Sequence, residues 1–295
     1  MYDAIIAEHL KPLQPEPTGR TPRVERLPNI RAVLFDIYGT LLISGSGDVG
    51  TAAAVNKGDA LDDALAAVGL AYRGDSLGGL SDFTDTIKAH HAKLHDAGIE
   101  YPEVRIGEVW DDVLEIWRER GTLEGDADEA STSKLAIEYE MRVNPVWPMP
   151  GVAETLRALT QKGKVLGVVS NAQSFTPRLF AAAGRLIDEL GPLESLGVNH
   201  ELQFFSFESR RAKPGTSLYE EAVAGLAERG LEPSQTLYVG NDLLNDVMPA
   251  AKVGFRTALF SGDARSLRLR ESDERVEGVQ PDVEVTQLPQ LLDCV

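Results

Sequence analysis

The sequence predicts an α/β fold in which a doubly wound parallel sheet carries an inserted all-helical domain. Short apolar runs of strand length alternate with amphipathic helical patterns from about residue 150 onward, and this alternation is typical of a parallel sheet with helices on both faces. An earlier apolar run at residues 31–35 has the composition of a strand buried on both faces. Between the two, residues 44–147 show helical periodicity without a strand-like run. A helical insert therefore separates the first predicted strand from the rest of the sheet.

These patterns divide the chain into three parts. Residues 1–29 form an N-terminal extension, where five prolines between positions 12 and 28 favour extended chain over helix. Residues 30–43 and 148–295 form a Rossmann-like α/β core. Residues 44–147 form the helical domain that interrupts this core.

Each element is predicted from its own pattern. In the insert, apolar residues three and four positions apart predict helices at 59–70, 81–97, 102–120 and 127–143, with Ser81 as an N-cap. In the core, apolar runs predict strands at 164–170, 203–208, 236–240 and 256–260, and a short edge strand at 283–285. Amphipathic stretches between them predict helices at 152–161, 175–189, 218–229 and 246–253.

The composition is that of an ordinary globular protein, with 43% hydrophobic and 25% charged residues in 295. An excess of 46 acidic over 29 basic side chains gives a net charge of −17, which disfavours nucleic-acid binding but permits a small anionic substrate in a locally positive pocket. The N-terminus lacks the apolar core of a secretory signal, and no apolar run approaches the roughly 18 residues of a membrane span. Cys294 is the only cysteine, so no internal disulfide forms. We expect a cytoplasmic protein that acts on a small molecule and binds neither nucleic acid nor membrane; the sequence does not indicate its oligomeric state.

Polar side chains follow four of the predicted strands. Asp36 ends the first strand and Ser170-Asn171 ends the second, while Lys213-Pro214 lies in the loop after the third. The fourth strand is followed by the acidic stretch 240–246. Because ligands of parallel sheets bind outside the carboxyl ends of the strands, these four loops should converge on one crevice.

In this order, the four segments resemble the four motifs of the haloacid dehalogenase (HAD) superfamily. The first is Asp36-Ile-Tyr38-Gly39-Thr40-Leu41, and the last is Gly240-Asn241-Asp242-Leu-Leu-Asn-Asp246. The helical insert is similar to the cap domain that the superfamily places after its first motif. The resemblance covers about residues 30–262. It implies a HAD-like hydrolase, more a phosphatase than a dehalogenase, that forms a covalent aspartyl intermediate with a small phosphorylated substrate.

The residue types suit that chemistry. Asp36 is the candidate nucleophile, and Lys213 would offset the negative charge that nucleophile and substrate share. For substrate binding, the candidates are Tyr38, Thr40, Ser170 and Asn171.

Oxygen donors at the same strand ends suggest a divalent cation. Asp36, the main-chain carbonyl of Tyr38, Asn241, Asp242 and Asp246 form an oxygen-rich set that suits Mg²⁺. A cation there would reduce the repulsion between the carboxylate and a phosphate.

Two positions depart from the commonest form of the superfamily's pattern. Tyr38 stands where most of its phosphatases carry a second aspartate, the general acid and base, and Asn241 stands where they usually carry the first metal-binding aspartate. Tyrosine is a poor base at neutral pH, so Tyr38 would not replace the aspartate that exchanges protons with the leaving alcohol and the attacking water. Substrates whose leaving group needs no proton should therefore react faster than alkyl phosphates.

Two alternatives follow from these departures. The motif D-x-Y-G-T is also that of the 2-haloacid dehalogenases, which need no metal; against them stand the two carboxylates Asp242 and Asp246 and the absence of arginine from residues 41–72. The alternative of another class is a catalytically weak pseudo-enzyme that binds a ligand or a partner.

Two groups of residues in the insert have structural interpretations. His90, His91 and His95 lie at helical spacing, but no third metal ligand is evident and we expect them to be solvated. Trp110 and Trp117 should share a helix face, either in the core of the insert or along a pocket.

Overall fold

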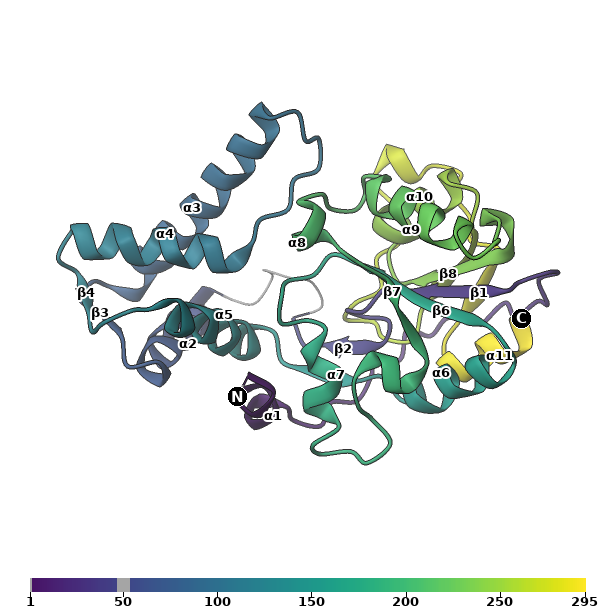
Figure 1. Ribbon diagram of the computed structural model, residues 1–295, viewed down its shortest axis with the longest axis horizontal. Coiled ribbons are helices and arrows are strands. Elements are labelled where there is room, and N and C mark those ends of the chain that lie inside the picture. The colour runs from purple at the N-terminus through teal and green to yellow at the C-terminus, as the bar shows by residue number, and fades with distance from the viewer. Residues whose placement is uncertain (1, 47–53) are drawn as a thin grey trace.

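The computed structural model describes residues 2–46 and 54–295 and contains a six-stranded, wholly parallel sheet (Figure 1). The strand order is β10-β9-β8-β1-β6-β7, which places β1 in the middle of the sheet between β6 and β8. The strands are β1 (Ala32–Phe35), β6 (Val165–Ser170), β7 (Val198–Phe205), β8 (Thr236–Gly240), β9 (Arg256–Phe260) and β10 (Val283–Val285). The predicted α/β fold class is confirmed.

Helices cover both faces of this sheet, and β1 is therefore buried on both sides. Val33 and Phe35 point into one hydrophobic cluster, and Ala32 and Leu34 point into another. The first cluster is covered by α6 (Val152–Gln161), α7 (Arg178–Ala183) and α11 (Leu291–Cys294). The second is covered by α9 (Ser217–Ala227) and α10 (Met248–Lys252). Figure 1 shows these two layers on opposite sides of the strands.

The helical insert packs around a hydrophobic cluster of its own. Its helices are α2 (Ala54–Ala67), α3 (Ser76–Asp96), α4 (Ile106–Glu119) and α5 (Glu129–Val143). Trp110 and Trp117 are fully buried there, and the ring of Phe83 stacks on Trp110 at 4.3 Å between centroids. These tryptophans therefore belong to the core of the insert, and neither lines the candidate active-site cavity described below.

Short strands that the periodicity did not predict complete the insert. β2 (Leu42–Ser44) pairs antiparallel with β5 (Val146–Pro148), so the chain enters and leaves the insert through one two-stranded stalk. Within the insert, β3 (Ala71–Tyr72) pairs with β4 (Leu123–Glu124). Strands of two or three residues are too short to show an alternating pattern.

Several predicted boundaries are corrected by local signals. Helix α3 begins five residues before Ser81, because Asp75 is its N-cap and accepts a hydrogen bond from the Leu77 amide. The helix expected at 175–189 is reduced to α7, which ends at Ala183 with Gly184 as its C-cap. Strand β7 begins and ends earlier than predicted and is followed by the short helix α8 (Ser206–Ser209). β7 is an edge strand and carries exposed polar residues, so its first half does not form the apolar run that is typical of a buried strand.

The N-terminal segment is packed onto the core to a degree that its prolines did not indicate. Helix α1 (Tyr2–His9) lies against α7 of the core and α5 of the insert (Figure 1). Ile6 is fully buried, and Leu10, Leu27 and Ile30 join the same cluster as Val33. None of the helices in the described residues is both long enough and apolar enough to cross a bilayer.

Candidate active site

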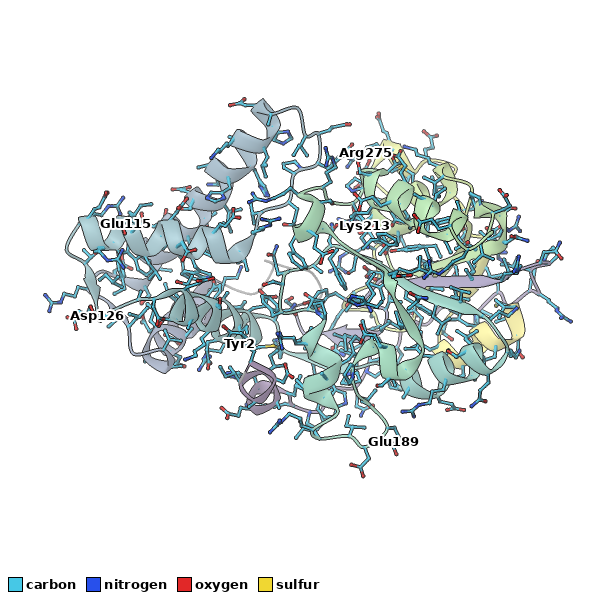
Figure 2. All side chains as sticks on the ribbon, viewed as in Figure 1. Tyr2, Glu115, Asp126, Glu189, Lys213 and Arg275 are labelled. Carbon is cyan, nitrogen blue, oxygen red and sulfur yellow. The ribbon has the colours of Figure 1, made fainter. Side chains whose placement is uncertain are left out.

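The four sequence motifs meet at the carboxyl ends of β1, β6 and β8, as the parallel arrangement requires. They surround a cavity of about 80 Å³. The cavity is lined by Asp36, Tyr38, Ser44, Asn171, Lys213, Asn241, Asp242, Asn245, Asp246, Ser266 and Arg268. Figure 2 shows Lys213 in the α/β core, on the side that faces the insert.

The centre of the site is a buried lysine between two buried carboxylates. Lys213 Nζ lies 2.6 Å from Asp36 Oδ1 and 2.6 Å from Asp246 Oδ1. Burial by itself disfavours the ammonium form, but the charges of Asp246 and Asp36 outweigh this effect and raise the pKa of Lys213. Burial raises the pKa of the Asp246 carboxyl, and the Lys213 ammonium opposes that rise. The site therefore holds a permanently charged lysine at neutral pH.

Asp36 is held through one of its two carboxylate oxygens. Ser170 Oγ donates a hydrogen bond of 2.9 Å to Asp36 Oδ1, the same atom that Lys213 contacts. Among the described residues, Oδ2 receives no hydrogen bond from the protein. One oxygen is thus fixed while the other is available in a residue that is only 6% exposed, which is the arrangement that a nucleophilic carboxylate needs.

Asn171 positions the lysine. Its Oδ1 accepts a hydrogen bond of 2.8 Å from the Lys213 amide, and its Nδ2 donates one of 3.2 Å to the Lys213 carbonyl. Ser170 and Asn171, which were predicted to bind substrate, thus hold Asp36 and Lys213 in this structure.

Asp246 anchors the loop of the fourth motif. Its Oδ2 accepts hydrogen bonds of 3.0 Å from the amides of Asn241 and Asp242, and its Oδ1 accepts one of 3.1 Å from Tyr238 Oη. Gly240 is required at this point, because a Cβ there would lie 2.4 Å from Asp246 Cγ.

The other two predicted metal ligands of this motif also have protein partners. Asp242 Oδ1 caps the following helical turn by accepting from the Leu244 and Asn245 amides, and Asp242 Oδ2 lies 2.6 Å from Arg270 Nη2. Asn241 Oδ1 accepts a hydrogen bond of 3.0 Å from Thr40 Oγ1. Thr40, a predicted substrate-binding residue, therefore faces Asn241.

The side chain of Tyr38 forms part of the cavity wall. Its hydroxyl lies 2.9 Å from Thr176 Oγ1, and burial raises its pKa. The hydroxyl is thus paired with Thr176 and stays protonated.

The donor atoms do not fit a preformed Mg²⁺ site. Octahedral Mg²⁺ needs carboxylate or carbonyl oxygens that are not already engaged, whereas Asp242 and Asp246 are bonded as described above. Within residues 2–46 and 54–295, no group of three or more His, Cys, Asp or Glu side chains is arranged to hold a metal ion. This includes the histidines of α3, where His90 Nε2 lies 2.8 Å from Asp112 Oδ2.

The sequence interpretation missed the contribution of the segment after β9. Ser266 and Arg268 line the cavity, and Arg270 binds Asp242. A signal was present, because three arginines at 265, 268 and 270 follow the end of a parallel strand in an acidic chain.

Comparison with known proteins gives the family of the chain. The family model for haloacid dehalogenase-like hydrolase matches residues 30–254. Over 149 residues, the chain is 27% identical to a ribulose-1,5-bisphosphate 5-phosphatase of Halopiger xanaduensis, which covers 50% of this chain and 56% of that protein. Over 150 residues, it is 27% identical to a glyceraldehyde 3-phosphate phosphatase of Methanothermobacter thermautotrophicus, which covers 49% and 58%. The chain therefore spans little more than half the length of these relatives.

A solved structure shares the fold. The crystal structure of a 2-haloacid dehalogenase from Pseudomonas syringae pv. Tomato DC3000 superposes with a TM-score of 0.56 at 20% identity, over 89% of this chain and 96% of that one. At this identity the likeness shows a common architecture.

Proposed function

The chain belongs to the family of haloacid dehalogenase-like hydrolases, and from this premise we propose that it dephosphorylates a small phosphorylated substrate with Asp36 as the nucleophile. The proposal is carried by the hydrogen bonds of the Asp36 carboxylate. Lys213 and Ser170 both bind Oδ1 and so fix the carboxylate, which leaves Oδ2 available to attack a substrate. The similarity to two relatives named as phosphatases supports phosphate as the group transferred.

The reaction follows in two steps. Asp36 Oδ2 attacks phosphorus, the leaving oxygen departs with the electrons of its bond to phosphorus, and an aspartyl phosphate forms. The leaving oxyanion takes any proton that it needs from solvent. Water then attacks the phosphorus of this intermediate, and the bond from phosphorus to Asp36 Oδ2 breaks. Free phosphate is released, the Asp36 carboxylate is restored, and the proton of the attacking water passes to solvent. Lys213 stabilises the charge of the Asp36 carboxylate before the attack and after its release, because it is buried and fixed before the substrate arrives. Arg268 adds positive charge to the cavity wall.

The magnesium ion predicted from the sequence stays a prediction. When bound, it would supply positive charge between the carboxylate and the phosphate. Because Asp242 and Asp246 are engaged by other groups, no step above is assigned to it. We also propose a cytoplasmic location. The proposed division of the chain is an N-terminal extension at residues 1–29, an α/β core at 30–43 and 148–295, and a helical cap at 44–147.

Tyr38 favours a second candidate, a 2-haloacid dehalogenase. Its hydroxyl is bonded to Thr176, so position 38 provides no acid for an alkoxide leaving group. A halide leaves without a proton: Asp36 would attack the carbon that carries the halogen, halide would depart, and water would hydrolyse the resulting ester.

One experiment separates these candidates. The protein is assayed with an aryl phosphate, an alkyl phosphate and a 2-haloacid, with and without EDTA. The mass of the acid-quenched enzyme is then measured by intact-mass spectrometry to detect a covalent adduct. We expect turnover of the aryl phosphate and a phosphorylated enzyme. Turnover of the haloacid alone would establish the dehalogenase, and no turnover of any substrate would favour the pseudo-enzyme.

The matched variant is Asp36→Asn, which keeps the shape of the side chain but removes the nucleophile. We expect its rate to fall below about one per cent of wild type while the protein still folds. Asp85→Asn, at an exposed carboxylate on α3, is the control and should keep full activity. Normal turnover by Asp36→Asn would rule out the covalent mechanism.

A further inference from the structure

Residues 266–270 lie along the loop of the fourth motif and bind it at several points. The Arg268 amide donates to the Asn241 carbonyl at 3.0 Å, and the Leu243 amide donates to the Arg268 carbonyl at 2.9 Å. Asn241 Nδ2 donates to the Ser266 carbonyl at 2.6 Å. These bonds resemble the pairing of two strands, and they fix the position of the segment relative to the cavity.

The same segment also closes on the first motif. Gly39 has a φ of 82°, and a Cβ at this position would lie 2.5 Å from Ser266 Cβ. The glycine of the first motif is therefore needed for the approach of residues 266–270 as well as for the turn after Asp36. Segment 266–270 is built into the site.

Arg270 ends this segment with its guanidinium on Asp242. Nη2 lies 2.6 Å from Asp242 Oδ2, and Nε lies 3.2 Å from Oδ2 and 3.3 Å from Oδ1. The Asp242 side chain is 7% exposed and that of Arg270 is 31% exposed. Oδ1 also accepts two main-chain hydrogen bonds, so both oxygens of this carboxylate are occupied.

We propose that the Arg270 guanidinium is the cation that pairs with the Asp242 carboxylate and that it excludes a divalent metal ion from this position. The site therefore binds no divalent metal ion at Asp242 while Arg270 is in place. The proposal rests on the proposed function, since it concerns the same cavity. A planar guanidinium that contacts both oxygens of a buried carboxylate is a strong, directional partner. A metal ion could bind Asp242 only by displacing it, which would leave the Arg270 charge without this partner.

The charges around the cavity agree with this assignment. Among the described residues, the carboxylates that line it are Asp36, Asp242 and Asp246. Lys213 lies between the first and the third, Arg270 binds the second, and Arg268 lines the wall. The chain therefore supplies its own cation to each of these carboxylates.

The test measures metal binding without substrate, so its failure is distinguishable from a failure of the proposed function. Mn²⁺ is titrated into the protein and its free EPR signal is followed, and Mg²⁺ binding is followed by calorimetry. We compare wild type with Arg270→Gln, which removes the charge, and Arg270→Lys, which keeps it. Arg275→Gln is the matched control, because Arg275 is an exposed arginine of the same loop that pairs with Asp273.

We expect no saturable binding to wild type or Arg275→Gln at millimolar metal, and an affinity at least about tenfold higher in Arg270→Gln than in Arg270→Lys. Saturable sub-millimolar binding by wild type would overturn the proposal. So would a folded Arg270→Gln, with a wild-type circular dichroism spectrum, that gains no affinity. If Arg270→Gln does not fold, the wild-type titration decides alone.

Discussion

At the scale of the residue, the three charges of Asp36, Lys213 and Asp246 depend on one another. Each is less than 9% exposed, and an ion of this kind is tolerated in the interior only when it is paired and hydrogen bonded. The ammonium of Lys213 serves two carboxylates at equal distances of 2.6 Å. Removing it would leave two buried negative charges facing each other.

Lys213→Met tests this dependence. We expect the rate to fall at least about 10²-fold, which is the loss of one preorganised electrostatic group. The free energy of unfolding should fall by about 3–5 kcal/mol, as when one partner of a buried pair is removed. Steady-state kinetics and urea unfolding measure the two effects. Lys88→Met, at an exposed lysine of α3, should change neither; equal behaviour of the two variants would show that Lys213 carries no special role.

We expect Tyr38 to determine which leaving groups the site accepts. Because position 38 offers no acid, aryl phosphates should react about 10²–10⁴ times faster than alkyl phosphates. Tyr38→Asp should narrow this ratio by improving alkyl substrates, whereas Tyr38→Phe should leave it unchanged because the hydroxyl faces Thr176. The measurement is kcat/KM for one substrate of each kind in the three proteins. A ratio that collapses in Tyr38→Phe would contradict this interpretation, since it would make the hydroxyl a participant.

At the scale of the element, α1 connects the two parts of the molecule. It packs against α7 of the core and α5 of the insert. On one side Arg178 Nη1 lies 3.2 Å from Asp3 Oδ1, and on the other His9 Nε2 lies 2.8 Å from Glu138 Oε2. Ile6 is fully buried between them.

Ile6→Ala should therefore be costly. Deleting a buried isoleucine side chain down to Cβ typically removes about 2–5 kcal/mol from the free energy of unfolding. Glu8→Ala, at an exposed position of the same helix, should stay within about 0.5 kcal/mol of wild type. Urea unfolding monitored by tryptophan fluorescence measures both. If the two variants are equally stable, α1 is a loosely attached appendage.

At the scale of the whole molecule, a second contact joins the insert to the loop that carries Lys213. The Glu103 amide donates to the Arg210 carbonyl at 3.0 Å, and the Ala212 amide donates to the Tyr101 carbonyl at 2.8 Å. Glu108 pairs with Arg210. The insert thus contacts the residues immediately before Lys213, and a movement of the insert would shift the loop that carries this lysine.

Beside this contact, we expect the Glu103 carboxyl to make the stability of the protein depend on pH. Its carboxyl accepts a hydrogen bond of 2.7 Å from Ser206 Oγ, and burial raises its pKa from 4.5 to about 6. The folded protein therefore binds this proton more tightly than the unfolded chain, so the stabilisation is present below pH 4.5 and is lost as pH rises through 6. The shift corresponds to about 2 kcal/mol at most.

The measurement is the free energy of unfolding of wild type and Glu103→Gln between pH 4.5 and 7. We expect the difference between the two proteins to change across this range in favour of Glu103→Gln at the higher pH, because the glutamine never acquires the charge. A difference that does not vary with pH would mean that the Glu103 carboxyl has the same pKa in the folded and the unfolded protein.

The amino-acid sequence by itself determined the fold class and the place of the site. A central parallel strand must be apolar on both faces, so residues 31–35 were recognisable, and strands 236–240, 256–260 and 283–285 have the predicted bounds. The carboxyl ends of such strands meet at one edge of a sheet, so Asp36, Ser170, Lys213 and Asp246 could be brought together without coordinates. This part of the prediction depends only on local periodicity and on the geometry of parallel sheets.

How these groups are paired depends on the tertiary structure. Arg270 and Asp242 are 28 positions apart, and Tyr38 and Thr176 are 138 apart; no periodic pattern links residues at such distances. The burial of Ile6 could not be predicted from the sequence either. A helix of eight residues followed by prolines is too short for its periodicity to indicate which element it packs against. Whether Asp242 faces a metal ion or a guanidinium depends on where the chain after β9 returns. That path is set by the packing of the whole molecule, and local sequence does not contain it.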